Sequence, residues 1–89
     1  MTSLEKALTL ISDEKVAEAF LKDICTPQEL KALKERWKIA QLLHFKNLSY
    51  REIHEQTGAS LTTVGRVARF LREEKNQGYL KLLQETLSS

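Results

Sequence analysis

The chain has 89 residues, of which 42% are hydrophobic and 29% are charged, and its formal net charge is +2. This length fits a single domain over residues 1–89, and the hydrophobic content excludes wholesale disorder. A single cysteine excludes a disulfide framework and no cluster of metal-ligating residues is present, so we expect additional burial to come from self-association.

Two short helices are expected near the N-terminus. Apolar residues recur at three- and four-residue spacing over residues 4–11 and again over residues 16–24. Ser12 is the expected N-cap of the second helix, with Asp13 and Glu14 favourably placed in its first turn.

The clearest helix start is the sequence TPQE at residues 26–29. Thr26 can cap the helix, Pro27 suits the first position because its missing N–H has no partner there, and Glu29 completes a capping box. Apolar residues on two sides favour a helix that continues to about Phe45, roughly 30 Å long at 1.5 Å per residue. A helix of this length with apolar residues on two sides is suited to packing against a second subunit.

A second capping box, Ser49 with Glu52, predicts a short helix that begins at Tyr50. Gly58 is expected to end it, because glycine adopts the left-handed conformation that other residues resist. Ser60 is expected to cap the next helix, whose buried face would consist of Leu61, Val64, Ala68 and Leu71.

A last helix is expected after the polar sequence NQG at residues 76–78. Its apolar residues are Tyr79, Leu80, Leu83 and Leu87. Because the alternation typical of strands is missing from the whole chain, the sequence predicts an all-α fold.

The sequence YREIHEQTGASLTTVGRVAR, which begins at Tyr50, matches a DNA-binding helix-turn-helix. It departs from that pattern at His54, where a small residue usually lets the two helices approach. Gly58 stands at the turn, and the inward-facing positions are Ile53, Ala59, Val64 and Val67.

The second helix of this motif is expected to enter the major groove. Its N-terminal residues would then point at base edges, and its cations would neutralise nearby phosphates. Threonine can hydrogen-bond either kind of base edge and offer its methyl group to thymine. Gly65 costs about 1 kcal/mol relative to alanine inside a helix, and a close approach to DNA or a trapped water would explain it. Ser60, Thr62 and Thr63 are expected in the groove, and Arg51, Arg66 and Arg69 on phosphates. The full expected DNA-binding set is Tyr50, Arg51, His54, Ser60, Leu61, Thr62, Thr63, Gly65, Arg66 and Arg69.

Charge is distributed unevenly along the chain. Residues 1–25 carry three basic and five acidic groups, a net charge of −2. Residues 26–48 carry five basic and two acidic groups, a net charge of +3, and residues 49–72 carry four and two, a net charge of +2. The positive middle of the chain fits an anionic partner.

The same residues also have structural interpretations. Trp37 fits a core position, and Ser60 can cap a helix whether or not it meets DNA. The cations at three-residue spacing also fit a solvated face with local partners such as Glu73; they are Arg66, Arg69, Arg72 and Lys75.

Enzymatic chemistry has little support in the sequence. Cys25 has no histidine at a spacing that predicts contact, and we expect it to be buried and inert. His44 and His54 lie on separate helices, with no cysteines or carboxylates at metal-ligand spacing, and no glycine-rich phosphate loop is present. We expect no enzyme activity, no cofactor and no metal. The missing leader and the missing long apolar run lead us to expect a cytoplasmic protein.

From Cys25 to about Leu71 the chain resembles the Trp repressor family, through the segments CTPQEL, EIHEQTGAS and TTVGRV. It is more similar to the short Trp-repressor-related branch of bacteria than to the tryptophan-responsive repressor. The resemblance implies a six-helix, all-α subunit whose outer helices interlock with a twin. Two helix-turn-helix heads of this homodimer would read half-sites of a palindromic operator roughly 34 Å apart.

In the tryptophan-responsive members two arginines sandwich the indole of the corepressor, and the resemblance puts Arg36 and Arg66 at those positions. Val67 stands where the family has a glycine, and Phe70 stands where it has a serine that meets the amino group of the ligand. These two bulky side chains would fill the cavity. We therefore expect that free tryptophan is not a ligand and that both arginines serve structure or phosphate contacts.

The sequence thus predicts a homodimeric, sequence-specific regulator that binds double-stranded DNA and represses transcription by occluding a promoter. The alternative is a helical protein-interaction module that keeps the fold and docks an acidic partner on its arginine face. The residues identify neither an operator nor an effector.

Overall fold

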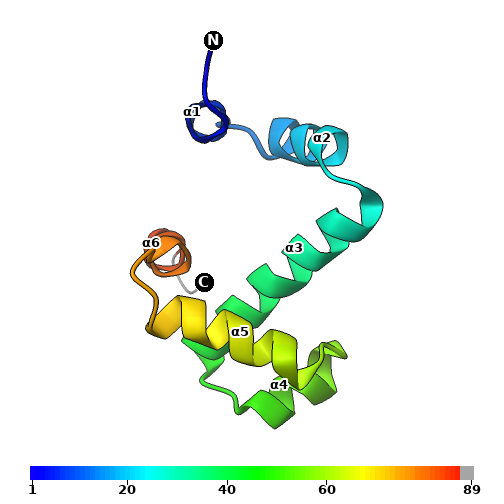
Figure 1. Cartoon of the computed structure of the whole chain (residues 1–89), viewed down its shortest axis with the longest axis vertical. Helices are drawn as coiled ribbons and strands as arrows, with labels where there is room; N and C mark the ends of the chain where they lie inside the picture. The colour runs from blue at the N-terminus through cyan, green and yellow to red at the C-terminus, as the bar shows by residue number, and fades with distance from the viewer. Residues whose placement is uncertain (87–89) are drawn as a thin grey trace. The chain divides into compact units, whose positions relative to one another are not determined.

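The computed structural model describes residues 1–86, which form α-helices and one π-helical segment, η1, without a strand (Figure 1). This confirms the predicted all-α fold with six helices. The elements are α1 (Leu4–Thr9), α2 (Glu14–Ile24), α3 (Pro27–Gln41), η1 (Leu42–Lys46), α4 (Tyr50–Thr57), α5 (Leu61–Arg72) and α6 (Gly78–Glu85).

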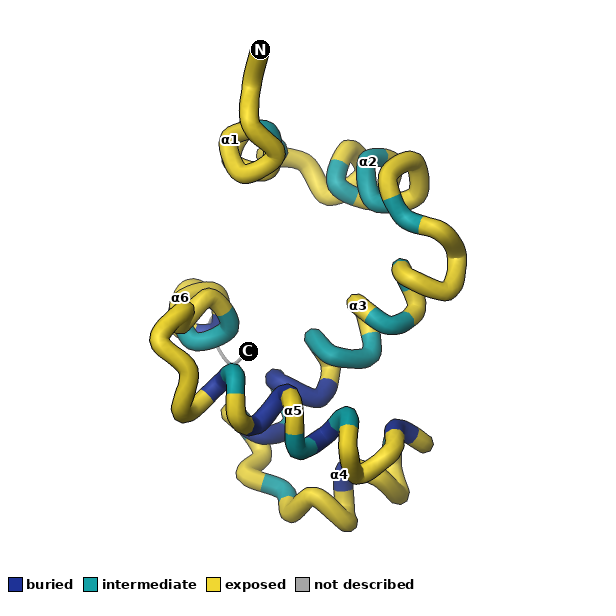
Figure 2. The backbone as a smooth tube through the Cα atoms, viewed as in Figure 1, coloured by how far each residue is buried: buried dark blue, intermediate teal, exposed yellow. Residues whose placement is uncertain are grey.

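The chain divides into two compact units, Met1–Lys31 and Ala32–Ser89. In the first unit α1 and α2 contain no buried residue, as Figure 2 shows. The N-cap of α2 is Asp13, whose carboxylate accepts a hydrogen bond from the Lys15 N–H at 2.7 Å. The prediction of Ser12 as the cap was wrong by one residue, because an ionised carboxylate makes the stronger bond to a helix N-terminal N–H.

The start of α3 is held by the predicted capping box. The Thr26 N–H donates to Glu29 Oε1 at 2.8 Å, and the Glu29 N–H donates to Thr26 Oγ at 3.1 Å. The helical path continues beyond α3 through η1 and stops at Asn47, which is left-handed with φ 52°. The long helix was therefore predicted to within about one residue of its end, but its last turn is π-helical.

The core of the second unit draws side chains from every helix it contains. α5 contacts both α4 and α6, which lie beside it in Figure 1. Trp37 is half-buried and packs against this core, in agreement with the core position predicted for it. The buried apolar residues are Ile39, Ala40, Leu43, Ile53, Ala59, Val64, Val67, Ala68, Leu71 and Leu83.

Two details of the last helices differ from the predictions. Leu61 is 52% exposed rather than buried, because it stands at the first position of α5, at the edge of the face defined by the buried residues. Gly78 is the first residue of α6, and the left-handed position before it is occupied by Gln77 with φ 56°. Leu87, which was predicted to belong to the last helix, lies outside the described residues.

The capping box of α4 makes the fold sensitive to acid. The Ser49 N–H donates to Glu52 Oε1 at 2.9 Å, and the Ser49 hydroxyl accepts from the Glu52 N–H at 3.1 Å. Hydrogen bonds from the Ser49 backbone and side chain lower the pKa of Glu52 from its ordinary value of 4.5. Since the folded-state pKa is the lower one, ionised Glu52 stabilises the fold above pH 4.5, and this contribution is lost as the pH falls through the folded-state pKa.

We expect Glu52→Gln to remove that part of the acid sensitivity, since glutamine can still accept the Ser49 N–H but does not titrate. The measurement is chemical denaturation of both proteins over a pH series. The wild type should lose stability faster than the variant below pH 4.5. Parallel pH curves would show that this capping box does not couple folding to protonation.

Candidate nucleic-acid interface

The turn between α4 and α5 has the geometry of a helix-turn-helix. Gly58 is left-handed with φ 78°, and its N–H donates to the His54 carbonyl at 2.9 Å. Thr57 Oγ1 donates to the Ile53 carbonyl at 2.7 Å and accepts from the Ala59 N–H at 3.1 Å. Ala59 is buried beneath the turn, as predicted for a small residue. The turn is therefore closed by its own hydrogen bonds.

His54 adds a contact that sequence reasoning missed. Its Nδ1 lies 2.6 Å from the Ala59 carbonyl oxygen. Because a carbonyl can only accept, Nδ1 is the donor in this contact. The side chain is exposed, and α4 and α5 pack together although His54 is not the small residue expected there.

The hydroxyl groups at the start of α5 differ in whether they hydrogen-bond to the protein. Ser60 Oγ accepts from the Thr63 N–H at 3.1 Å and donates to Thr63 Oγ1 at 3.0 Å, so these two residues are partly satisfied by one another. Thr62 is exposed, and within residues 1–86 its hydroxyl makes no hydrogen bond to the protein. Among the predicted groove-facing residues, Thr62 is thus the one with its full hydrogen-bonding capacity free.

The predicted DNA-binding residues are all accessible. Thr63 and Gly65 are half-buried and the other eight are exposed. Tyr50, Arg51 and His54 lie on α4, whereas the remaining members lie on or next to α5, which packs against α4. The structure therefore places the set on two adjoining helices, and its role in DNA binding stays a prediction.

The arginines of α5 have few acidic neighbours. The helix itself contains no Asp or Glu. Arg69 Nε lies 3.9 Å from Glu74 Oε2, so the local partner is Glu74 rather than the predicted Glu73, which ends the helix as its C-cap. The guanidinium carbons of Arg66 and Arg69 lie 4.4 Å and 5.1 Å from the centroid of the Phe70 ring.

Gly65 has no structural reason to lack a side chain within its own chain. It is half-buried in the middle of α5, and a Cβ atom built on it would meet no atom within 4 Å. A methyl group would therefore fit the isolated subunit.

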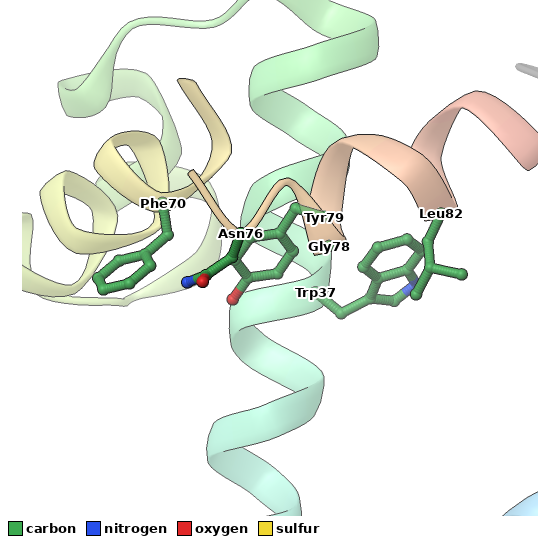
Figure 3. Close-up of a pocket in the computed structure, with 6 residues that line it drawn as sticks. All are labelled: Trp37, Phe70, Asn76, Gly78, Tyr79 and Leu82. Carbon is green, nitrogen blue, oxygen red and sulfur yellow. The ribbon is translucent and has the colours of Figure 1, made fainter. Parts of the chain in front are cut away.

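The family ligand positions differ in burial and in surroundings. Val67 belongs to the core, whereas Arg36 is half-buried on α3. Phe70 lines an apolar pocket of about 350 Å³ on the second unit, which Figure 3 shows from close by. Because this pocket depends on how α6 packs, no local sequence pattern predicted it. Its lining residues are Trp37, Phe70, Asn76, Gly78, Tyr79 and Leu82.

Other chemistry finds little support in the described part of the chain. Cys25, which was expected to be buried, is half-exposed as the C-cap of α2, a helix that contains no buried residue. Over residues 1–86 no group of three or more His, Cys, Asp or Glu side chains could hold a metal ion. Through residue 86, none of the helices has the length and apolar character needed to cross a membrane.

Comparison with known proteins gives two matches. A sequence model of the family described as Trp repressor protein matches residues 1–87. The uncharacterized protein YerC of Bacillus subtilis (strain 168) is 32% identical over 71 residues, which are 80% of this chain and 67% of that protein. No solved structure matches the chain.

Proposed function

The chain belongs to the Trp repressor family, as its sequence motifs predicted, and from this premise we propose that it binds a palindromic operator as a homodimer. Membership of this family supports a DNA-binding regulatory role. We propose further that it acts in the cytoplasm as a repressor, by occluding a promoter.

The observation that carries this proposal is that α5 has one face buried in the core and an opposite face that is polar and exposed. One face is buried in the core through Val64, Val67, Ala68 and Leu71. At helical spacing on the other side stand Thr62, Arg66 and Arg69, which are exposed. A helix anchored along one face, with a free hydroxyl at its N-terminal end and cations behind it, suits insertion into a major groove.

A homodimer is supported by the apolar side chains that the isolated subunit leaves in solvent. On α2, Val16 is 53% exposed and Ile24 is 52% exposed, although both belong to its apolar face. On α6, Leu82 is 60% exposed. Burial of such side chains against a second copy would contribute about 25 cal/mol for each Å² removed from water.

Two substitutions separate base reading from phosphate binding. We expect Arg51→Gln to weaken binding to all duplexes by a similar factor. Because the homodimer has two copies of Arg51, the slope of log K against log[salt] should fall in magnitude by about 2. Thr62→Val removes the hydroxyl but keeps the methyl group, so we expect it to relax discrimination at particular base pairs by about 1 kcal/mol.

Fluorescence anisotropy with a selected duplex and its single-base variants measures both effects. If the wild type binds every duplex equally, sequence-specific regulation is wrong. A protein that binds no DNA but captures acidic protein segments on its arginine face would instead be a protein-interaction module.

We propose that free tryptophan is not the effector. The supporting observations are that Val67 fills core space and that the Phe70 ring already contacts the guanidinium of Arg66. Calorimetric titration with tryptophan at sub-millimolar concentration should therefore give no binding heat. Saturable heat in that range would show that the site has opened.

A further inference from the structure

Phe70 contacts two cations at once. Its side chain is half-buried, and its ring forms part of the apolar pocket that also contains Trp37 and Tyr79 (Figure 3). The guanidinium carbons of Arg66 and Arg69 lie 4.4 Å and 5.1 Å from its centroid. Both distances are within the range of about 6 Å over which a ring attracts a cation.

An aromatic ring and a carboxylate order an arginine side chain in different ways. The five N–H donors of a guanidinium lie in its plane, so stacking over a ring leaves them free, whereas a carboxylate occupies two of them and neutralises the charge. Within residues 1–86 Arg66 makes no ion pair, and the 3.9 Å between Arg69 and Glu74 is too long for a hydrogen bond. Arg66 therefore keeps its donors free and its charge unpaired, whereas Arg69 keeps its donors free but lies beside the Glu74 carboxylate.

We propose that Phe70 is a positioning residue for DNA binding, which holds Arg66 and Arg69 with their N–H groups free to donate to phosphate oxygens. This inference rests on the proposed DNA-binding function. An unrestrained arginine loses conformational entropy when it binds a phosphate, and a side chain ordered beforehand loses less. Phe70 touches no DNA in this scheme and acts through the two arginines.

The test compares Phe70→Leu, which keeps an apolar side chain without a ring, with Phe70→Tyr, which keeps the ring. The probe is a selected duplex of about three helical turns, enough for two half-sites, titrated at several salt concentrations. We expect Phe70→Leu to raise Kd about tenfold, which corresponds to about 1.4 kcal/mol, and to lower the salt slope. Phe70→Tyr should stay close to the wild type in both measurements.

A double-mutant cycle distinguishes the positioning role of Phe70 from a purely structural one. In an Arg66→Gln/Arg69→Gln background, Phe70→Leu should cause no further loss, because no guanidinium remains to be ordered. An equal loss in that background, or wild-type affinity of Phe70→Leu alone, would overturn the positioning role. Thermal unfolding checks that each variant is folded, and Phe70→Met repeats the comparison should the leucine variant be unstable. If the wild type itself binds no duplex, the DNA-binding function fails first and the positioning role falls with it.

Discussion

Replacing Gly65 by alanine is expected to stabilise the fold and weaken DNA binding at the same time. Alanine is favoured over glycine inside a helix by about 1 kcal/mol, and the added Cβ meets no atom within 4 Å. For a domain of this size that gain corresponds to a rise in Tm of about 4–8 °C. If DNA lies against this stretch of α5, the same methyl group crowds it and costs about 1–3 kcal/mol of binding, roughly 5- to 150-fold in Kd.

Gly58→Ala is the matched control, because it makes the same change at the turn of the motif. Gly58 has φ 78°, where a Cβ atom costs about 1–2 kcal/mol, so the Tm of the Gly58→Ala variant should fall. Scanning calorimetry and DNA titration of both variants give the comparison. A Gly65→Ala protein that is more stable and binds DNA as the wild type does would place the duplex away from Gly65.

Substitution of Val16 by glutamate is expected to convert a dimer into monomers and to remove most of the DNA affinity. Val16 is in the first turn of α2, where an acidic residue favours the isolated helix. A carboxylate on the apolar face of α2 would, however, have to be desolvated in an interface between subunits. Loss of the second head would reduce affinity for a two-half-site operator by about 10²- to 10⁴-fold.

Ala19→Glu is the control for added charge, since Ala19 is exposed on the other side of α2. It should remain dimeric and bind DNA normally. Sedimentation velocity of the three proteins over a concentration series reports the oligomeric state. A wild type that sediments as a monomer at every concentration would contradict the homodimer.

The features that were predicted correctly depend on residues close together in the sequence. The Thr26–Glu29 and Ser49–Glu52 capping boxes close within one helical turn, and the left-handed Gly58 needs only its own missing side chain. Such local signals located the start of α3 and both ends of α4.

The errors occurred where neighbouring residues compete or where distant elements meet. Ser12 and Asp13 both can cap a helix, and only the structure distinguishes them. The apolar pocket is lined by residues of α3, α5 and α6, so no local sequence pattern predicts it. In contrast, the contact of Arg66 with Phe70 spans four residues of one helix and could have been predicted from that spacing.

Selection of genomic DNA fragments by the purified protein, repeated at two salt concentrations, addresses whether α5 reads a duplex. We expect recovered fragments to share two inverted half-sites whose centres lie about one helical turn, or 34 Å, apart, with weaker recovery at the higher salt. Recovery of no shared sequence at either salt concentration would contradict DNA reading by this helix and favour a protein-docking role for its arginine face.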